Sequence, residues 1–202
     1  MSVSGAVFDM VKLLDVSKNV ISKFTAEKIY EEALKWAKRY DEELVKMLTE
    51  DKEYAMKILN IERGGNKPRK DISKWAEIKH SIEYMYDEVF DKNMEYEFQN
   101  ITDKEEIKEI VSSYLTKHFD INDDKQTWFD KMKDLAEERG YAREVKEYKA
   151  NPENYKGHVG DISTVIRVTL TGRHNTPDLY EIMQILGNER IEKRINKICG
   201  GN

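Results

Sequence analysis

Helix-breaking residues are sparse in this chain, and their scarcity limits it to a mainly helical fold. Its 202 residues include three prolines and ten glycines, with stretches rich in Glu, Lys, Leu, Ile and Met between them. Proline and glycine are the least favourable residues in a helix interior, whereas Leu, Met, Lys and Glu are among the most favourable. The sequence therefore predicts an all-α protein.

Apolar residues at helical spacing mark two helices in the second half of the chain. In residues 102–116 they form one stripe behind a capping box, in which Thr102 is followed three residues later by Glu105. The same spacing recurs in residues 128–136, and Gly140 stands where a left-handed helix end is expected. Both segments are predicted to be amphipathic helices.

A further helix start is visible near the C-terminus. Thr176 is predicted as the N-cap, Pro177 as the first helical residue, and Asp178 as an acid at the positive end of the helix dipole. Gly187 is expected to end this helix, and a last helix is expected over residues 189–198. Two consecutive helices are thus expected in this part of the chain.

The first half of the chain is also predicted to be helical, with a change of character near its end. The segments predicted as helices are residues 26–39, 42–48, 52–61 and 72–90. Residues 87–105 are acid-rich and weakly patterned, which suggests a boundary between subdomains in or before this stretch. We expect two consecutive helical subdomains, residues 1–80 and 81–202, with the boundary between about residues 75 and 105.

One segment, residues 162–170, fits two structures. Its apolar and β-branched residues alternate, which is typical of a strand. Asp161 and Ser163 are suitable N-caps, however, and Gly172 is a suitable C-terminal stop, which favours a helix. The residues alone leave both interpretations open.

No segment resembles a membrane anchor or a secretion signal. The uncharged apolar stretches are a few residues long, whereas a membrane-spanning helix needs about 20. The first residues lack the basic and long apolar parts of a signal peptide. A single cysteine, Cys199, excludes an intramolecular disulfide. We expect a reducing, cytoplasmic location and no membrane partner.

Local motifs for catalysis and for metal binding are incomplete. Residues 120–124 begin like a calcium loop, but Lys125 replaces the turn glycine and Lys131 replaces the bidentate glutamate. An acidic helix start before Trp128 is the expected structure instead. The four histidines lack metal-ligand spacing, and the glycine pair at 64–65 does not continue as a phosphate-binding loop. No catalytic residue and no metal site are predicted.

Positive charge is concentrated in two places. The chain has 34 Lys and Arg against 39 Asp and Glu, a net charge of −5, which argues against a protein that coats nucleic acid over its whole surface. Residues 62–79 nevertheless hold six basic and three acidic residues. A second basic patch comprises Lys156, His158, Arg167 and Arg173. The patches fit either an ordinary mixed surface or a contact with a nucleic-acid backbone and unstacked bases.

Motifs at both ends of the chain resemble one protein family. Residues 4–13, SGAVFDMVKL, followed by SKN at 17–19, resemble the segment after the catalytic KMSKS loop of bacterial glutamyl-tRNA synthetases. Residues 160–190 contain IRVTLTG, TPDLYEIM and LGNER, which resemble the C-terminal signature of that family. The resemblance covers essentially the whole chain and is thin over residues 87–124. It implies the C-terminal anticodon-binding region, with two all-helical subdomains and therefore a helix at 162–170.

The resemblance also implies site residues. Arg69 lies where the family places an arginine that reads the anticodon, and Arg167 and Leu179 lie at anticodon-contacting positions of the second subdomain. An arginine can donate to the acceptors of a pyrimidine's pairing edge, and an apolar side chain can support a splayed base. Leu179 fits a core position of its helix equally well. Charge alone adds three phosphate contacts, namely Lys67, Lys70 and Arg173.

Partners and cofactors follow from the same resemblance. The expected partner is the anticodon stem-loop of tRNA(Glu), bound by a monomer, and no DNA partner is expected. The family's catalytic half joins glutamate to tRNA with ATP and magnesium, but residues 158–161 and 70–74 match its two ATP-binding motifs only partly. This chain alone is therefore expected to be non-catalytic and to need no cofactor. The alternative is a free-standing helical adaptor that binds protein through the acidic and aromatic residues 84–98.

Overall fold

The computed structural model describes residues 9–93 and 95–200. Its contacts divide the chain into two compact units, Met1–Tyr86 (unit 1) and Asp87–Asn202 (unit 2). The described residues form helices joined by turns, with no strand among them, so the predicted all-α class is confirmed. None of these helices is both long and apolar enough to cross a lipid bilayer. Residues 4–8 of the N-terminal motif lie outside the described ranges.

Unit 1 is built around one long amphipathic helix, α2. Its helices are α1 (Met10–Ile21), α2 (Ala26–Tyr40), α3 (Glu42–Glu50), α4 (Lys52–Leu59) and α5 (Ile78–Ile82). Ile29, Ala33 and Ala37 of α2 recur every fourth residue and are buried where α2 packs against α3 and α4. Asp41 and Asp51 cap the N-termini of α3 and α4, so tight acidic turns join these helices. The helices predicted at 26–39, 42–48 and 52–61 are confirmed.

The single helix predicted over residues 72–90 is wrong. The segment consists of a 3₁₀ turn at Trp75–Glu77, α5, and a second 3₁₀ turn at Glu83–Met85, after which Tyr86 is extended with φ −102° and ψ 120°. Two tertiary hydrogen bonds hold this break. The hydroxyl of Tyr86 donates to Met47 O at 2.9 Å, and the hydroxyl of Tyr54 donates to Met85 O at 2.7 Å. The helical pattern did not reveal this break, because the two partners of each bond are more than thirty residues apart in the sequence.

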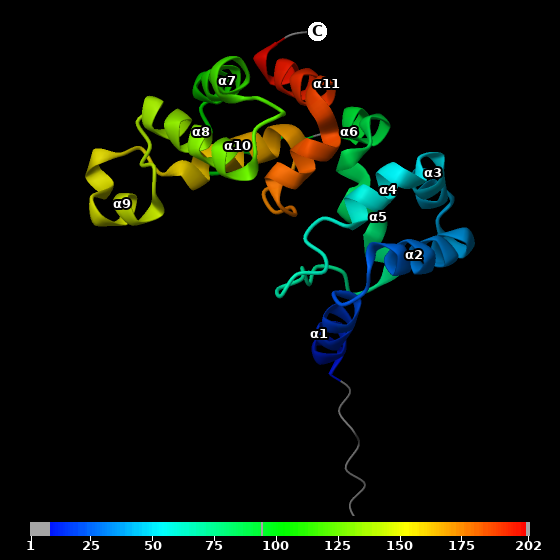
Figure 1. Cartoon of the computed structure of the whole chain (residues 1–202). Helices are drawn as coiled ribbons and strands as arrows, with labels where there is room; N and C mark the ends of the chain where they lie inside the picture. Colours follow the sequence, from blue (N-terminus) through cyan, green and yellow to red (C-terminus); the bar gives the residue numbers. More distant parts are fainter. Residues whose placement is uncertain (1–8, 94, 201–202) are drawn as a thin grey trace, which may run out of the picture. The chain divides into compact units, whose positions relative to one another are not determined.

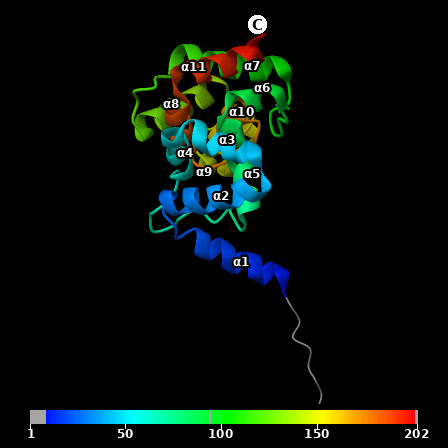
Figure 2. The ribbon, with the colours of Figure 1, turned by 90° about the vertical axis from the view of Figure 1, so that its right-hand side faces the viewer.

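The first described helix, α1, was not predicted. It stands at the edge of unit 1, on the far side of α2 from α3 and α4 (Figure 2). Four of its apolar side chains, Met10, Leu13, Val16 and Val20, are between 48% and 55% exposed. Its N-cap is Asp9, which accepts a hydrogen bond from the backbone N–H of Lys12.

Unit 2 surrounds a central helix, α10. Its helices are α6 (Asp87–Asn93), α7 (Lys104–Ser113), α8 (Lys125–Glu138), α9 (Val145–Ala150), α10 (Val159–Thr171) and α11 (Leu179–Cys199), with a π-helical turn at Tyr114–His118 and a 3₁₀ turn at Pro152–Asn154. α10 packs against α7, α8 and α11 (Figure 1). Ile162, Ile166, Val168 and Leu170 of α10 are all completely buried. A helix buried on several sides needs apolar residues all round, which explains why its sequence resembled a strand.

The helix at 162–170, which the residues alone left open, is confirmed with a different N-cap. His158 caps α10 by accepting from Gly160 N at 3.0 Å, and the Asp161 side chain accepts in return from His158 N at 2.8 Å. Asp161 is therefore inside the helix, as the third residue of a capping box. Gly172 ends α10 in the left-handed conformation with φ 67°.

Three other helix boundaries in unit 2 test the predicted caps. Asp103, not Thr102, caps α7, and Asp178, not Thr176, caps α11. In both places the aspartate side chain accepts from the N–H three residues on, which leaves the threonine outside the helix. The acidic start before Trp128 is confirmed, because Asp124 caps α8. Gly187 is also confirmed as a break, with φ 75° and ψ 168° within α11.

A buried arginine joins three helices of unit 2. The Arg194 side chain is 1% exposed and comes from α11. Its Nη1 donates to Leu170 O at the end of α10 at 2.6 Å, and its Nη2 donates to Asp87 Oδ1 of α6 at 2.9 Å. The guanidinium also lies 3.8 Å from the centre of the Phe90 ring. A charged group is stable at this depth only because it is paired and hydrogen-bonded.

We predict that Arg194→Ala destabilises unit 2 by about 3–5 kcal/mol, because it leaves a buried carbonyl without its donor and Asp87 without its buried partner. Arg190→Ala is the matched control, since Arg190 Nε binds the same carboxylate at 3.0 Å but its side chain is 36% exposed. We expect a cost below about 1 kcal/mol for this control. Urea unfolding followed by circular dichroism measures both, and equal costs would contradict the assignment.

We also predict that Gly157→Ala destabilises the start of α10 by about 1–3 kcal/mol through overpacking. A Cβ at position 157 would lie 2.5 Å from Asp161 Oδ2 and 3.0 Å from the Tyr141 ring, so the capping box would have to shift. Gly65→Ala is the control, because no atom lies within 4 Å of the added Cβ and the glycine has no positive φ. The two melting temperatures should differ clearly, with that of Gly65→Ala close to that of the parent chain.

Candidate nucleic-acid interface

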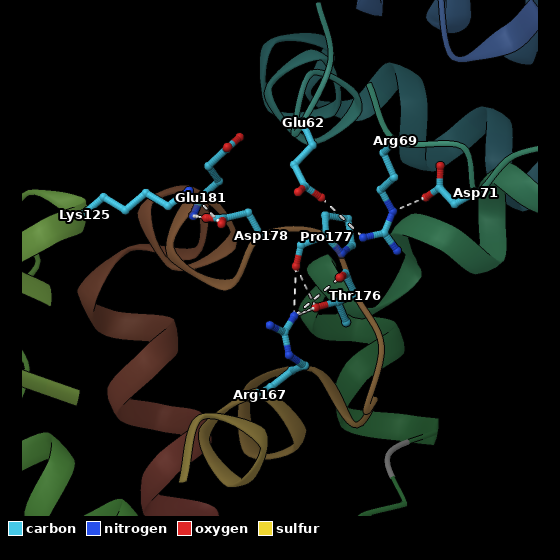
Figure 3. Close-up of polar contacts among 9 residues, drawn as sticks. All are labelled: Glu62, Arg69, Asp71, Lys125, Arg167, Thr176, Pro177, Asp178 and Glu181. Atoms are coloured by element: carbon cyan, nitrogen blue, oxygen red, sulfur yellow. Dashed lines mark hydrogen bonds and ion pairs between the residues drawn. The ribbon is translucent and has the colours of Figure 1, made fainter. Parts of the chain in front are cut away.

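The first predicted site residue, Arg69, lies in the loop between α4 and α5 of unit 1 and is oriented by two carboxylates. Its Nε donates to Asp71 Oδ2 at 2.7 Å, and its Nη1 lies 3.4 Å from Glu62 Oε2 (Figure 3). Its backbone N–H donates to Glu62 O at 3.2 Å. The Arg69 side chain is 21% exposed, and its Nη2 has no hydrogen-bond partner among the described residues. The guanidinium is therefore held in one orientation, and its Nη2 is available to donate to a ligand.

The basic run around Arg69 is less positive than its sequence suggests. Lys79 is neutralised by Glu43 and Asp41, with Nζ–O distances of 2.5 Å and 3.6 Å, and Lys74 lies 3.9 Å from Glu77 Oε1. Arg63 folds back, and its Nε donates to Leu59 O at 2.7 Å. Burial lowers the pKa of the Arg63 guanidinium, with the Asp71 carboxylate acting in the opposite direction. Arg63 and Lys79 are thus held by protein partners, whereas the Lys74 side chain is still 60% exposed.

Lys67 and Lys70, the two predicted phosphate contacts of this loop, are arranged differently. Both residues are exposed. Neither forms an ion pair or hydrogen bond with another described residue, and they flank the oriented Arg69 in the sequence. The loop thus presents two exposed cations on either side of one fixed guanidinium. This arrangement suits an anionic partner, since long lysine side chains follow phosphates while a held arginine can recognise a defined edge.

The second predicted site residue, Arg167, lies in α10 and holds the loop that leads into α11. Its Nη1 donates to Pro177 O at 2.9 Å and to the side-chain hydroxyl of Thr176, and lies 3.5 Å from Thr176 O (Figure 3). At the end of this loop, Asp178 caps α11 and also binds Lys125 Nζ at 2.7 Å. The last three residues of the loop are therefore held by side chains from α10 and α8.

Arg173 and Leu179 lie at the two ends of this loop. Thr171 Oγ1 donates to Arg167 O at 2.7 Å and accepts from Arg173 N at 3.2 Å, which fixes the backbone next to the Arg173 side chain. Leu179 is 2% exposed, as the first residue of α11. Its burial favours the core position over a direct contact with a base.

Thr176 and Thr171 are the residues of this site that the pattern missed. Thr176 was predicted as a helix cap because Thr-Pro-Asp is typical of a helix start. In the structure its hydroxyl is the partner of Arg167, nine residues earlier. No local spacing rule connects a helix-interior arginine to a threonine in the following loop. Among the described residues, no three His, Cys, Asp or Glu side chains are placed to hold a metal ion.

Over nearly its whole length the chain is similar to proteins named glutamate–tRNA ligase. It is 49% identical to the glutamate–tRNA ligase of Acetivibrio thermocellus over 201 residues, which cover 98% of this chain and 36% of that protein. It is 46% identical to the glutamate–tRNA ligase of Clostridium perfringens strain SM101, again over 98% of this chain and 36% of the relative. For the enzyme of Sorangium cellulosum the values are 41%, 95% and 33%.

The chain thus spans about a third of the length of these relatives. The family described as anticodon binding domain matches residues 28–199, which include Arg69, Arg167 and both loops described above. This match covers most of unit 1 and nearly all of unit 2. The chain belongs to the family of anticodon-binding domains.

Proposed function

We propose that this chain binds the anticodon loop of a tRNA and contributes to its recognition. The observation that carries the proposal is the pair of arginines within the family match, each held by its own side-chain and backbone partners. Preorganised donors discriminate between bases because a wrong base leaves a positioned donor unpaired. An acidic protein can bind RNA in this way because the contact is small and directed.

The proposed roles of the site residues differ by their surroundings. Arg69 and Arg167 donate to the pairing edges of unstacked anticodon bases, a chemistry that suits a planar guanidinium. Lys67, Lys70 and Arg173 contact phosphates and add affinity without sequence preference. We assign Leu179 a supporting role, in which its buried side chain holds the first turn of α11 next to residues 172–178, the recognition loop.

The relatives of this chain are longer proteins, and they suggest the enzyme in which it works. We propose that this chain acts as part of a glutamate–tRNA ligase, with tRNA(Glu) as substrate and with ATP and magnesium used elsewhere in that enzyme. Its match to named glutamate–tRNA ligases over 95–98% of its own length supports this assignment. We propose a monomer that works in the cytoplasm. The protein-binding adaptor is not favoured, because it gives no reason for an anticodon-binding family match.

We predict that Arg167→Ala weakens binding of a tRNA(Glu) anticodon stem-loop by about 1–3 kcal/mol and reduces discrimination against a stem-loop with a swapped anticodon. Arg143→Ala is the control, because Arg143 is a partly exposed arginine of unit 2 outside the site, bound to Asp134 and Glu137. Filter binding with both RNAs measures the effect. Unchanged discrimination in Arg167→Ala would remove Arg167 from the site, and absence of binding to either RNA would favour the adaptor.

We predict a different signature for the lysines. The double variant Lys67→Ala/Lys70→Ala should weaken binding to both RNAs equally and reduce the slope of log K against log salt by roughly 2, one for each lost phosphate contact. Lys146→Ala/Lys149→Ala is the control, since these two exposed lysines of α9 lie outside the site. A changed ratio between cognate and swapped anticodons would show that the lysines contact bases instead.

A further inference from the structure

Unit 2 contains a cavity of about 510 Å³ that the anticodon site does not use. Its walls come from the segment between α6 and α7, the first turns of α7 and the C-terminal end of α11. The recognition loop before α11 attaches to the opposite end of that helix (Figure 1). Cavities of roughly 300–1,000 Å³ with an apolar lining and a few polar groups are typical of small-molecule sites.

Two aromatic rings form one wall of the cavity. Tyr96 and Phe98 lie nearly parallel, with an interplanar angle of 16° and ring centres 6.1 Å apart. Both side chains are only partly buried, so the ring pair is open to the cavity. Burial raises the pKa of the Tyr96 hydroxyl, which keeps the ring neutral. A planar ligand can extend such a stack, and every nucleobase has a face suited to it.

Two isoleucines complete the apolar lining. Ile107 of α7 is 3% exposed, and Ile198 of α11 is partly exposed. Together with the ring pair they give the cavity apolar surface from three segments of unit 2. A flat aromatic group is favoured here over a strongly hydrated one, because apolar surface gains free energy when a ligand excludes water from it.

Positive charge lines the cavity from two helices. Its lining contains three lysines, Lys104, Lys108 and Lys197, against one acid, Glu97. Lys104 and Lys108 are one turn apart on α7 and therefore share a face. Such a cluster beside an aromatic wall suits a ligand that carries an anionic group next to a planar ring.

Two of these lysines are ion-paired, but their partners do not fully neutralise the positive charge at the cavity. Lys108 binds Glu105 at 2.9 Å, but the Glu105 side chain is 78% exposed, and such surface pairs exchange at little cost. Lys197 shares Asp91 with Lys193, so two ammonium groups are balanced by one carboxylate. Lys104 has no ion pair or hydrogen bond among the described residues. An added anion would therefore be attracted to Lys104 and Lys108 first.

We propose that this cavity is a nucleotide-binding site, in which the base stacks on the Tyr96–Phe98 ring pair and the phosphate binds Lys104 and Lys108. The ligand is either a free mononucleotide or a nucleotide exposed in an RNA strand, since both present the same base and phosphate. The site is independent of the anticodon function, because none of its lining residues belongs to the loops around Arg69 and Arg167.

The test is a titration of the isotope-labelled chain, followed by NMR, with AMP, adenosine, inorganic phosphate and a short single-stranded RNA. AMP should shift the amide signals of residues 96–98, 104–108 and 197–198 saturably. Adenosine and phosphate, which each lack one half of the ligand, should bind about tenfold more weakly than AMP. If the RNA shifts the same signals at lower concentration than AMP, the natural ligand is a strand; if AMP binds more tightly, it is a free nucleotide.

Matched variants separate the two contacts. Phe98→Leu keeps an apolar side chain but removes the stack, and Lys104→Ala/Lys108→Ala removes the phosphate partners. Each should weaken AMP binding about tenfold. Phe129→Leu and Lys146→Ala/Lys149→Ala, which alter a half-exposed ring of α8 and two lysines of α9, should leave it unchanged. Circular dichroism confirms that every variant is folded.

The proposal is overturned if AMP shifts signals elsewhere, if AMP and phosphate bind equally, or if Phe98→Leu binds AMP as the parent chain does. Comparison with Arg167→Ala distinguishes failure of the cavity site from failure of the anticodon function. That variant should bind AMP normally, while Phe98→Leu should retain anticodon discrimination. Loss of discrimination in Arg167→Ala with unchanged AMP binding in all variants would remove the cavity site and leave the anticodon function standing.

Discussion

The buried guanidinium of Arg194 is the contact on which unit 2 depends. It joins α11 to the carbonyl of Leu170 near the end of α10 and to Asp87 at the start of α6, and it lies 3.8 Å from the centre of the Phe90 ring. Nη1 and Nη2 bind partners on two different helices, so one planar group restrains three helices together. Arg194 follows the break at Gly187, so it fixes the second part of α11. The first turn is held separately, by the Asp178 cap and by the contacts of Arg167 with the preceding loop.

The proposed recognition arginines use the same chemistry nearer to the surface. Arg69 is held by Glu62 and Asp71, and Arg167 by Thr176 and Pro177. In Arg194 these bonds stabilise the core, because the side chain is almost completely buried. In Arg69 the same kind of bonds fix the orientation of a group that is still 21% exposed. Burial therefore separates a structural arginine from one that is available to a ligand, although their partners are similar.

The accuracy of sequence-based prediction followed the range of the interactions involved. Helices with an apolar stripe and a short acidic turn, such as α2, α3 and α8, were predicted within a few residues. The helix expected over 72–90 was wrong because hydrogen bonds from Tyr54 and Tyr86 to distant carbonyls interrupt it. The predicted cap at Thr176 was wrong because an aspartate two residues later performs that role. The role of Thr176 as a partner of Arg167 depends on the fold of the loop.

The sequence by itself determined the all-α class, the breaks at Gly140, Gly172 and Gly187, and the motifs that mark the family. These properties depend on residues within one or two turns of each other, where backbone geometry and capping act directly. Only the tertiary structure decided that Asp87 pairs with Arg194, 107 residues away, and that α10 is buried on several sides. It also decided which cations stay available to a partner, because burial and ion pairing are set by neighbours that no local pattern specifies.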